Sequence, residues 1–183
     1  GCGKSSLIKA GLLPRLAGHV LPIYLESTPD DTEARLSKGI RHKFRDLAQD
    51  LGLVEMIATL RRGSVLLSGQ KVLIVLDQFE QWLFAKRNET DTKLVSALRL
   101  CDGERVQAVV MVRDEFWMAA SRLMRELEIR FTNDEYSTAV DLFDPPHARK
   151  VLAAFGRAYD VITEPTGPTP EQQAFIDQAV DGL

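Results

Sequence analysis

The sequence predicts an α/β fold in which helices cover both faces of a parallel β-sheet. Short apolar stretches that suit strands alternate with amphipathic stretches that suit helices along most of the 183 residues. Residues 71–76 after Lys71, and residues 106–112 apart from Gln107, are apolar, as in strands covered on both faces. Joining such strands through helices makes parallel neighbours with right-handed crossovers. Together these three observations predict the fold class.

The first half of the chain predicts two strands and two helices. These are a strand at 20–25, helices at 29–43 and 53–61, and the strand at 71–76. The strand at 20–25 is β-branched and apolar. The helix at 29–43 has a start like a capping box, with Thr28 as the cap, Pro29 in the first turn and Asp31 after it. Gly63 ends the helix at 53–61.

In the second half of the chain, predicted strands and helices continue to alternate, and a linker then follows. The expected elements are a helix at 91–100, strands at 106–112 and 136–142, and helices that follow Arg113, Asp144 and Thr169. The helix after Arg113 carries Phe116, Trp117, Ala120, Leu123 and Met124, and the buried face of the helix after Asp144 is Ala148, Val151, Leu152 and Phe155. Three prolines and a glycine within 163–170 indicate a linker.

Composition excludes several classes of protein. With 45% hydrophobic and 27% charged residues, the chain suits one globular domain, or one domain and the beginning of another. A net charge of -3 provides no general basic field, so we expect no nucleic-acid partner. No apolar run is long enough for a membrane span, and no signal-peptide pattern is seen. Two cysteines without metal spacing favour a reducing, cytoplasmic setting and argue against zinc.

The chain opens on Gly1-Cys2-Gly3-Lys4-Ser5-Ser6, the second half of the phosphate-binding pattern G-x-x-x-x-G-K-[ST]. In that pattern the glycine lets backbone amides face a phosphate, the lysine contacts the β and γ oxygens, and the following serine offers a hydroxyl to Mg²⁺. A chance match is the alternative. Because the leading glycine and an initiator Met are absent, we expect an internal piece of a longer nucleotide-binding protein.

The helix expected after this loop aims its positive dipole end at the same anion. Its apolar face is predicted to be Leu7, Ile8, Leu12 and Leu13, and Pro14 and Gly18 end the run.

Asp77 follows the apolar run at 71–76, which is the pattern of a Walker B strand. A carboxylate at the carboxyl end of such a strand reaches a Mg²⁺ held beside the phosphate loop. A strand-ending turn aspartate is the alternative reading of this residue alone. Gln78 stands where many ATPases keep a water-activating glutamate, so Glu80 is the nearest replacement. Glu80 either polarises the attacking water or is an ordinary acid at a helix start.

Arg113 ends the apolar run at 106–112, beside the Walker B strand. A guanidinium there can reach a γ-phosphate and so distinguish triphosphate from diphosphate. The alternative is a surface arginine paired with Asp114.

The sequence Leu67-Ser68-Gly69-Gln70 is read as a turn into the Walker B strand, because it abuts that strand and does not open a long helix.

Taken together, residues 3–14, 76–80 and 112–116 resemble the STAND class of P-loop NTPases, and within it the "novel STAND NTPase 1" group, over residues 1–160. The resemblance implies an ASCE-type sheet in the order 5-1-4-3-2, with the first strand missing from this chain. It implies ATP and Mg²⁺ as cofactors, phosphate binding by the loop from Gly1 to Ser6, Mg²⁺ held by Ser5 and Asp77, and γ-phosphate sensing by Arg113.

The same resemblance implies a multidomain setting. Residues 1–160 would be the NTPase core, and residues 161–183 a linker and the start of a helical lid. Neighbouring domains would include that lid, WD-type or other repeats and in some cases a protein kinase domain, in a bacterial signalling protein that assembles with nucleotide. We therefore expect a slowly hydrolysing ATP switch. The alternatives are a P-loop kinase or phosphotransferase, or a scaffold that binds nucleotide without turnover.

Overall fold

The computed structural model describes residues 3–129, 136–140, 144–162 and 167–181. The chain divides into two compact units, one made of Lys4–Thr138 and the other of Ala139–Leu183 with Gly1–Gly3. The sheet and the predicted Walker B strand lie in the first unit. The second contains a pair of helices.

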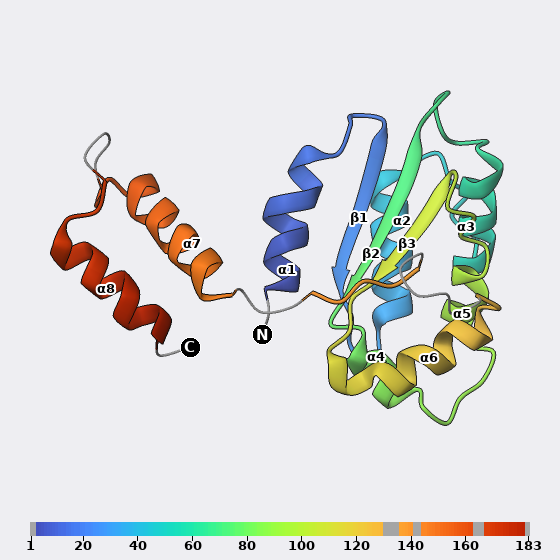
Figure 1. The fold of residues 1–183 in the computed structure, drawn as a ribbon. Coiled ribbons are helices and arrows are strands. Elements are labelled where there is room, and N and C mark those ends of the chain that lie inside the picture. Colours follow the sequence, from blue (N-terminus) through green and yellow to red (C-terminus); the bar gives the residue numbers. More distant parts are fainter. Residues whose placement is uncertain (1–2, 130–135, 141–143, 163–166, 182–183) are drawn as a thin grey trace. The chain divides into compact units, whose positions relative to one another are not determined.

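Three parallel strands form the sheet of the first unit, in the order β1-β2-β3 (Figure 1). They are β1 (Val20–Glu26), β2 (Lys71–Asp77) and β3 (Val106–Val110). In the register, Glu26 lies opposite Asp77 and Leu76 lies opposite Val110. The parallel sheet and all three of these strands are confirmed. In the implied order 5-1-4-3-2, strands 2, 3 and 4 are neighbours in the same way as β1, β2 and β3.

Side chains of the central strand β2 alternate between two hydrophobic clusters, one on each face of the sheet. Val72, Ile74 and Leu76 point into the larger cluster, and Leu73 and Val75 into the smaller one. This alternation explains the continuous apolar run in the sequence, because a strand covered on both faces needs apolar residues at every position.

The larger cluster is built from the helices that connect the strands and from one helix that follows β3. They are α2 (Thr32–Lys43), α3 (Leu53–Arg62), α4 (Glu80–Ala85), α5 (Lys93–Leu98) and α6 (Trp117–Glu126). Fully buried members include Leu36, Ile40, Met56, Leu60 and Leu94. Each such side chain stabilises the fold by about 1.5–3 kcal/mol relative to its exposed state. Most of the hydrophobic stabilisation of the unit therefore lies on this face.

The smaller cluster is covered by a first helical segment, which comprises α1 (Lys4–Ser6), η1 (Leu7–Leu12) and η2 (Leu13–Arg15). The middle part is a π-helix, and the amide of Leu13 donates to the carbonyl of Ile8, five residues back. Ile8 and Leu13 thus share the face that packs on the sheet. The predicted apolar face was wrong for Leu7 and Leu12, which are 53% and 37% exposed, because the π-turn changes the spacing of that face.

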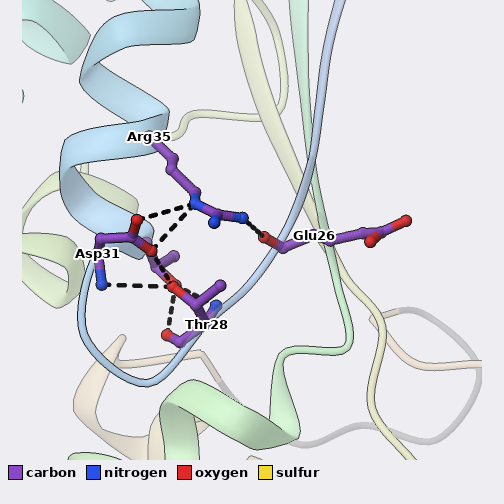
Figure 2. A network of polar contacts seen from close by, with 5 residues as sticks. Glu26, Thr28, Asp31 and Arg35 are labelled. Carbon is purple, nitrogen blue, oxygen red and sulfur yellow. Dashed lines mark hydrogen bonds and ion pairs between the residues drawn. The ribbon is translucent and has the colours of Figure 1, made fainter.

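Helix α2 begins three residues later than predicted. The Thr28 hydroxyl donates to the Asp31 carboxylate, and the Thr32 hydroxyl donates to the Thr28 carbonyl at 2.7 Å, so residues 28–32 first form a separate polar turn (Figure 2). Asp31 is the residue before the helix and makes no side-chain capping bond. The predicted role of Thr28 as the helix cap is therefore wrong, although its side chain does organise the helix entry.

Several other elements also begin or end a few residues away from their predicted positions. The strand predicted at 106–112 stops at Val110, the helix predicted at 91–100 is Lys93–Leu98, and a short 3-10 turn, η3 (Asp114–Phe116), precedes α6. A strand predicted at 136–142 is absent over residues 136–140, and residues 141–143 lie outside the described part. None of the described strands pairs with residues 136–140, and a strand is stable only beside a hydrogen-bonded neighbour.

The second unit pairs α7 (Pro145–Ala158) with α8 (Pro170–Asp181). Both predicted starts are confirmed: Asp144 accepts from the His147 amide at 2.7 Å, and Thr169 and Gln172 bond reciprocally. Phe155, predicted to be buried, is 57% exposed, whereas Ala148 on the same predicted face is 5% exposed, so the buried stripe of α7 is narrower than predicted. The domain boundary at residue 160 stays a prediction.

Among the described helices, none combines the length and the apolarity that a membrane crossing needs.

Candidate functional site

Three of the predicted site residues, Asp77, Glu80 and Arg113, lie at or just after the carboxyl ends of β2 and β3. Glu26 and Asp77 lie opposite each other as the last residues of β1 and β2. The first helical segment runs beside β1 in the opposite direction, because its Lys9 pairs with Glu26 at 2.9 Å while its far end packs near Val20. Its N-terminal end therefore lies at the same edge as the arrowhead of β1 (Figure 1). Ligands of open parallel sheets bind at this edge.

Both carboxylate oxygens of Asp77 accept hydrogen bonds. Oδ1 accepts from the backbone amide of Gln78 at 2.8 Å, and Oδ2 accepts from the Tyr24 hydroxyl. The side chain is only 3% exposed, so the two bonds fix it in one orientation. Gln78 adopts a left-handed backbone conformation with φ of 51°, which costs about 1 kcal/mol or more in a residue other than glycine. Such strain beside a carboxylate is typical of functional sites.

Tyr24 is a site residue that the sequence patterns did not reveal. The Nζ of Lys9 lies 4.7 Å from the centre of its ring, and Lys9 also pairs with Glu26. Pairing with Glu26 raises the pKa of Lys9, while burial and the bond to Asp77 raise the pKa of Tyr24. The phenol therefore stays protonated at neutral pH and remains a donor. The only sequence signal was a polar aromatic residue within an apolar strand.

Glu80 is the first residue of α4, three positions after Asp77. Its Oε2 is buried and has no hydrogen-bond partner among the described residues. The hydroxyl of Ser27 is in the same condition, and the Ser27 amide donates to the Asp77 carbonyl at 2.8 Å. Buried polar atoms without partners are rare because they carry a desolvation cost. The Glu80 oxygen therefore lacks the compensating bonds that both oxygens of Asp77 have.

The phosphate-loop residues are described only in part. Gly1 and Cys2 lie outside the described residues. Gly3 has a φ of 76°, the left-handed conformation that glycine adopts without strain. Lys4 and Ser5 are half-buried and Ser6 is exposed in α1. Phosphate binding by these residues stays a prediction.

Arg113 stands just after β3, before the turn η3. Its side chain is exposed, and its Nη2 pairs with Oε1 of Glu115 at 2.8 Å, not with Asp114. Among the described contacts, none joins Arg113 to Asp77 or Glu80. The structure therefore places Arg113 on the predicted edge without bringing it to the carboxylates.

The turn after β1 is fixed at the same edge. Arg35 donates to the backbone carbonyl of Glu26 at 3.4 Å and to the Asp31 carboxylate at 3.0 Å, and both bonds can be followed in Figure 2. Bonds from Thr28 and then Arg35 lower the pKa of Asp31. This network is exposed, so it contributes little to stability. Its effect is to hold the backbone that leaves β1 beside Asp77.

The residue set suits Mg²⁺ better than a metal held by protein ligands alone. Within the described part of the chain, no group of three or more His, Cys, Asp or Glu side chains could hold a metal ion. Mg²⁺ commonly needs only one or two carboxylates, with water and substrate phosphates as its other ligands. A single oriented Asp77 fits that requirement.

Comparison with known proteins identifies a family for the chain. The family model described as "Novel STAND NTPase 1" matches residues 1–165. Neither a curated protein nor a solved structure matches the chain significantly. The family match spans most of the chain, including the phosphate-loop pattern, the Walker B strand and Arg113. The chain therefore belongs to the novel STAND NTPase 1 family.

Proposed function

We propose that this chain is the ATP-binding, slowly hydrolysing module of a larger signalling switch. The observation that carries the proposal is the oriented carboxylate of Asp77, held at the carboxyl edge of a parallel sheet where the first helical segment also begins. Membership of an NTPase family supports nucleotide binding. The assignment of ATP and Mg²⁺, and of a switching role, is our proposal.

In this proposal Lys4 neutralises the β and γ phosphates, and Ser5 and Asp77 hold Mg²⁺. The ion, when bound, neutralises charge that develops on the phosphate oxygens. Asp77 needs no reorientation because Tyr24 and the Gln78 amide already fix it. A carboxylate held in this way avoids the entropic cost of ordering during the reaction.

Glu80 accepts the proton of the attacking water through its orphaned Oε2. A positioned general base accelerates such a step by about 10²–10⁴-fold. Arg113 contacts the γ-phosphate once it leaves Glu115. An exposed ion pair is weak, so exchanging it for a phosphate is favourable.

Loss of the γ-phosphate would release Arg113 and so report the nucleotide state to neighbouring domains. We infer that the chain after residue 160, which includes α8, begins the lid through which that state is transmitted. The partners of the nucleotide-binding module would be the lid, repeat domains or further copies of the protein. A scaffold that binds nucleotide without turnover is the second candidate, favoured by Gln78 in the position where many ATPases have glutamate.

The deciding experiment measures Mg-ATP binding and phosphate release by the natural full-length protein and by its Lys4→Ala variant. We expect binding to be lost in Lys4→Ala and kept in Lys38→Ala, which removes an exposed lysine of α2. Limited proteolysis in ATP and in ADP should give different cleavage patterns. Equal binding by all three proteins would refute the nucleotide site, and identical patterns in ATP and ADP would refute the switch.

A further inference from the structure

We propose that Tyr24 is a positioning residue for the Mg²⁺ site, acting through Asp77. This inference rests on the proposed function, because it concerns the same metal. Tyr24 lies on β1 and Asp77 on the neighbouring strand β2, and the Tyr24 hydroxyl donates to Oδ2 of Asp77. The opposite oxygen accepts from the Gln78 amide at 2.8 Å.

Two donors, one on each oxygen, leave a free lone pair on each oxygen for a metal ion or its bound water. Removing the Tyr24 hydroxyl would leave the carboxylate fixed at one oxygen only, and therefore free to rotate. Removing a hydrogen-bond partner of a metal ligand typically lowers the metal affinity about 10- to 100-fold. Tyr24 therefore sets the orientation of Asp77 without touching the ion.

The ring of Tyr24 is itself held in place. It packs against the smaller cluster, and Lys9 of the first helical segment lies over it while pairing with Glu26 at 2.9 Å. Phenylalanine would keep the ring, its packing and its contact with Lys9. A Tyr24→Phe change therefore removes the bond to Asp77 and leaves the surrounding packing in place.

The test is binding of a fluorescent ATP analogue by the full-length protein, titrated with Mg²⁺. In Tyr24→Phe we expect the half-saturating Mg²⁺ concentration to rise about tenfold. Nucleotide binding in EDTA should stay unchanged, since the lost hydroxyl acts on the metal ligand. The matched control is Tyr159→Phe, which removes a hydroxyl from a side chain that is 76% exposed in the second unit. It should leave both measurements unchanged.

An unchanged Mg²⁺ midpoint in Tyr24→Phe would overturn the proposal. An equal loss of binding with Mg²⁺ and with EDTA would also overturn it, because Tyr24 would then support the fold in general. A wild-type protein whose binding does not depend on Lys4 would refute the proposed function and this inference with it. Binding that depends on Lys4 but not on Tyr24 would refute this inference alone.

A second measurement needs no nucleotide. Thermal unfolding of wild type, Tyr24→Phe, Asp77→Ala, which removes both acceptor oxygens, and the double variant forms a double-mutant cycle. If the hydroxyl bonds the carboxylate, the double variant should lose less stability than the sum of the two single losses. Additive losses would mean that the two side chains are not coupled, and would overturn the proposal.

Discussion

Asp77 and Glu80 are three residues apart at the same edge of the sheet, yet the hydrogen bonding of their carboxylate oxygens differs. Both oxygens of Asp77 accept hydrogen bonds, whereas Oε2 of Glu80 is buried and has no partner among the described residues. A fully bonded carboxylate suits a fixed ligand. One with an orphaned oxygen suits proton transfer, because it can take up a proton without breaking a bond.

Glu80→Gln should lower the rate of phosphate release by about 100-fold or more and leave ATP binding intact. The amide keeps the size of the side chain but cannot take the proton of the water. Glu104→Gln, a change at an exposed glutamate before β3, serves as the control. A Glu80→Gln protein that hydrolyses ATP at the wild-type rate would remove Glu80 from the mechanism.

Arg113→Ala should reduce the preference for ATP over ADP by about tenfold, the effect of losing one hydrogen bond to a charged group. Equilibrium binding of both nucleotides measures this ratio. Glu115→Gln removes the present partner of Arg113 and should keep the preference or raise it. If Arg113→Ala and wild type prefer ATP equally, another residue senses the γ-phosphate.

Cys101 should resist alkylation in the folded protein. Burial, and then the nearby Asp102 charge, raise the pKa of this thiol to about 12. At pH 8 only about one thiol in ten thousand is then the reactive thiolate. Mass spectrometry of the peptide that carries Cys101 should show slow labelling by iodoacetamide in buffer and rapid labelling in guanidinium. Rapid labelling in both conditions would contradict the burial.

The same shift makes stability depend on alkaline pH. An unfolded thiol ionises near 9.0 and the folded one near 12, so the unfolded state loses its proton first. Stability is therefore expected to fall as pH rises from 9 to 12, by at most about 1.4 kcal/mol per pH unit from this group. Denaturant unfolding of wild type and Cys101→Ala should show a steeper alkaline loss in wild type. Parallel curves would contradict the assignment.

Asp102→Ala should destabilise the first unit by about 2 kcal/mol, measured by denaturant unfolding, and Asp102→Asn by less. The Oδ1 of Asp102 accepts from three backbone amides in the turn before β3, those of Glu104, Arg105 and Val106, at 2.9–3.0 Å. An asparagine oxygen can still accept these bonds, whereas alanine leaves the amides unpaired. Equal losses in the two variants would argue against the amide bonds.

Acid should remove part of the same stabilisation. Burial alone would raise the pKa of Asp102, but the three amide bonds outweigh it and hold the pKa below its usual value. The contribution is therefore complete above the unfolded value of 3.8 and is lost as pH falls through the folded value. Asp102→Asn should show a shallower acid transition than wild type.

Much of the sheet could be predicted from the sequence because its strands carry strong local patterns. The run ending at Asp77 is apolar at nearly every position, and only a strand covered on both faces requires that pattern. Asp77 and Arg113 were predicted as site residues because each directly follows an apolar run, and Glu80 because it is the nearest glutamate after Asp77. Helix ends were predicted less well, since polar turns such as that of Thr28 compete with capping.

The remaining features depend on contacts between distant parts of the chain. The π-turn at Leu7–Leu12 changes which residues face the sheet, and nothing in the local spacing announces it. Tyr24 gains its role from a bond to a residue 53 positions away. Phe155 is exposed although the local apolar pattern predicts it on the buried face, because tertiary packing decides how wide that face is.

The unequal covering of the two faces has a consequence for motion. One face of the sheet is held by many buried side chains from several helices, whereas the first helical segment is held mainly through Ile8 and Leu13. Segments with few buried contacts open locally at a small fraction of the global unfolding free energy. Amide hydrogens of residues 7–15 should therefore exchange with solvent well before those of α3, so the segment that follows the predicted phosphate loop opens without unfolding the sheet beneath it.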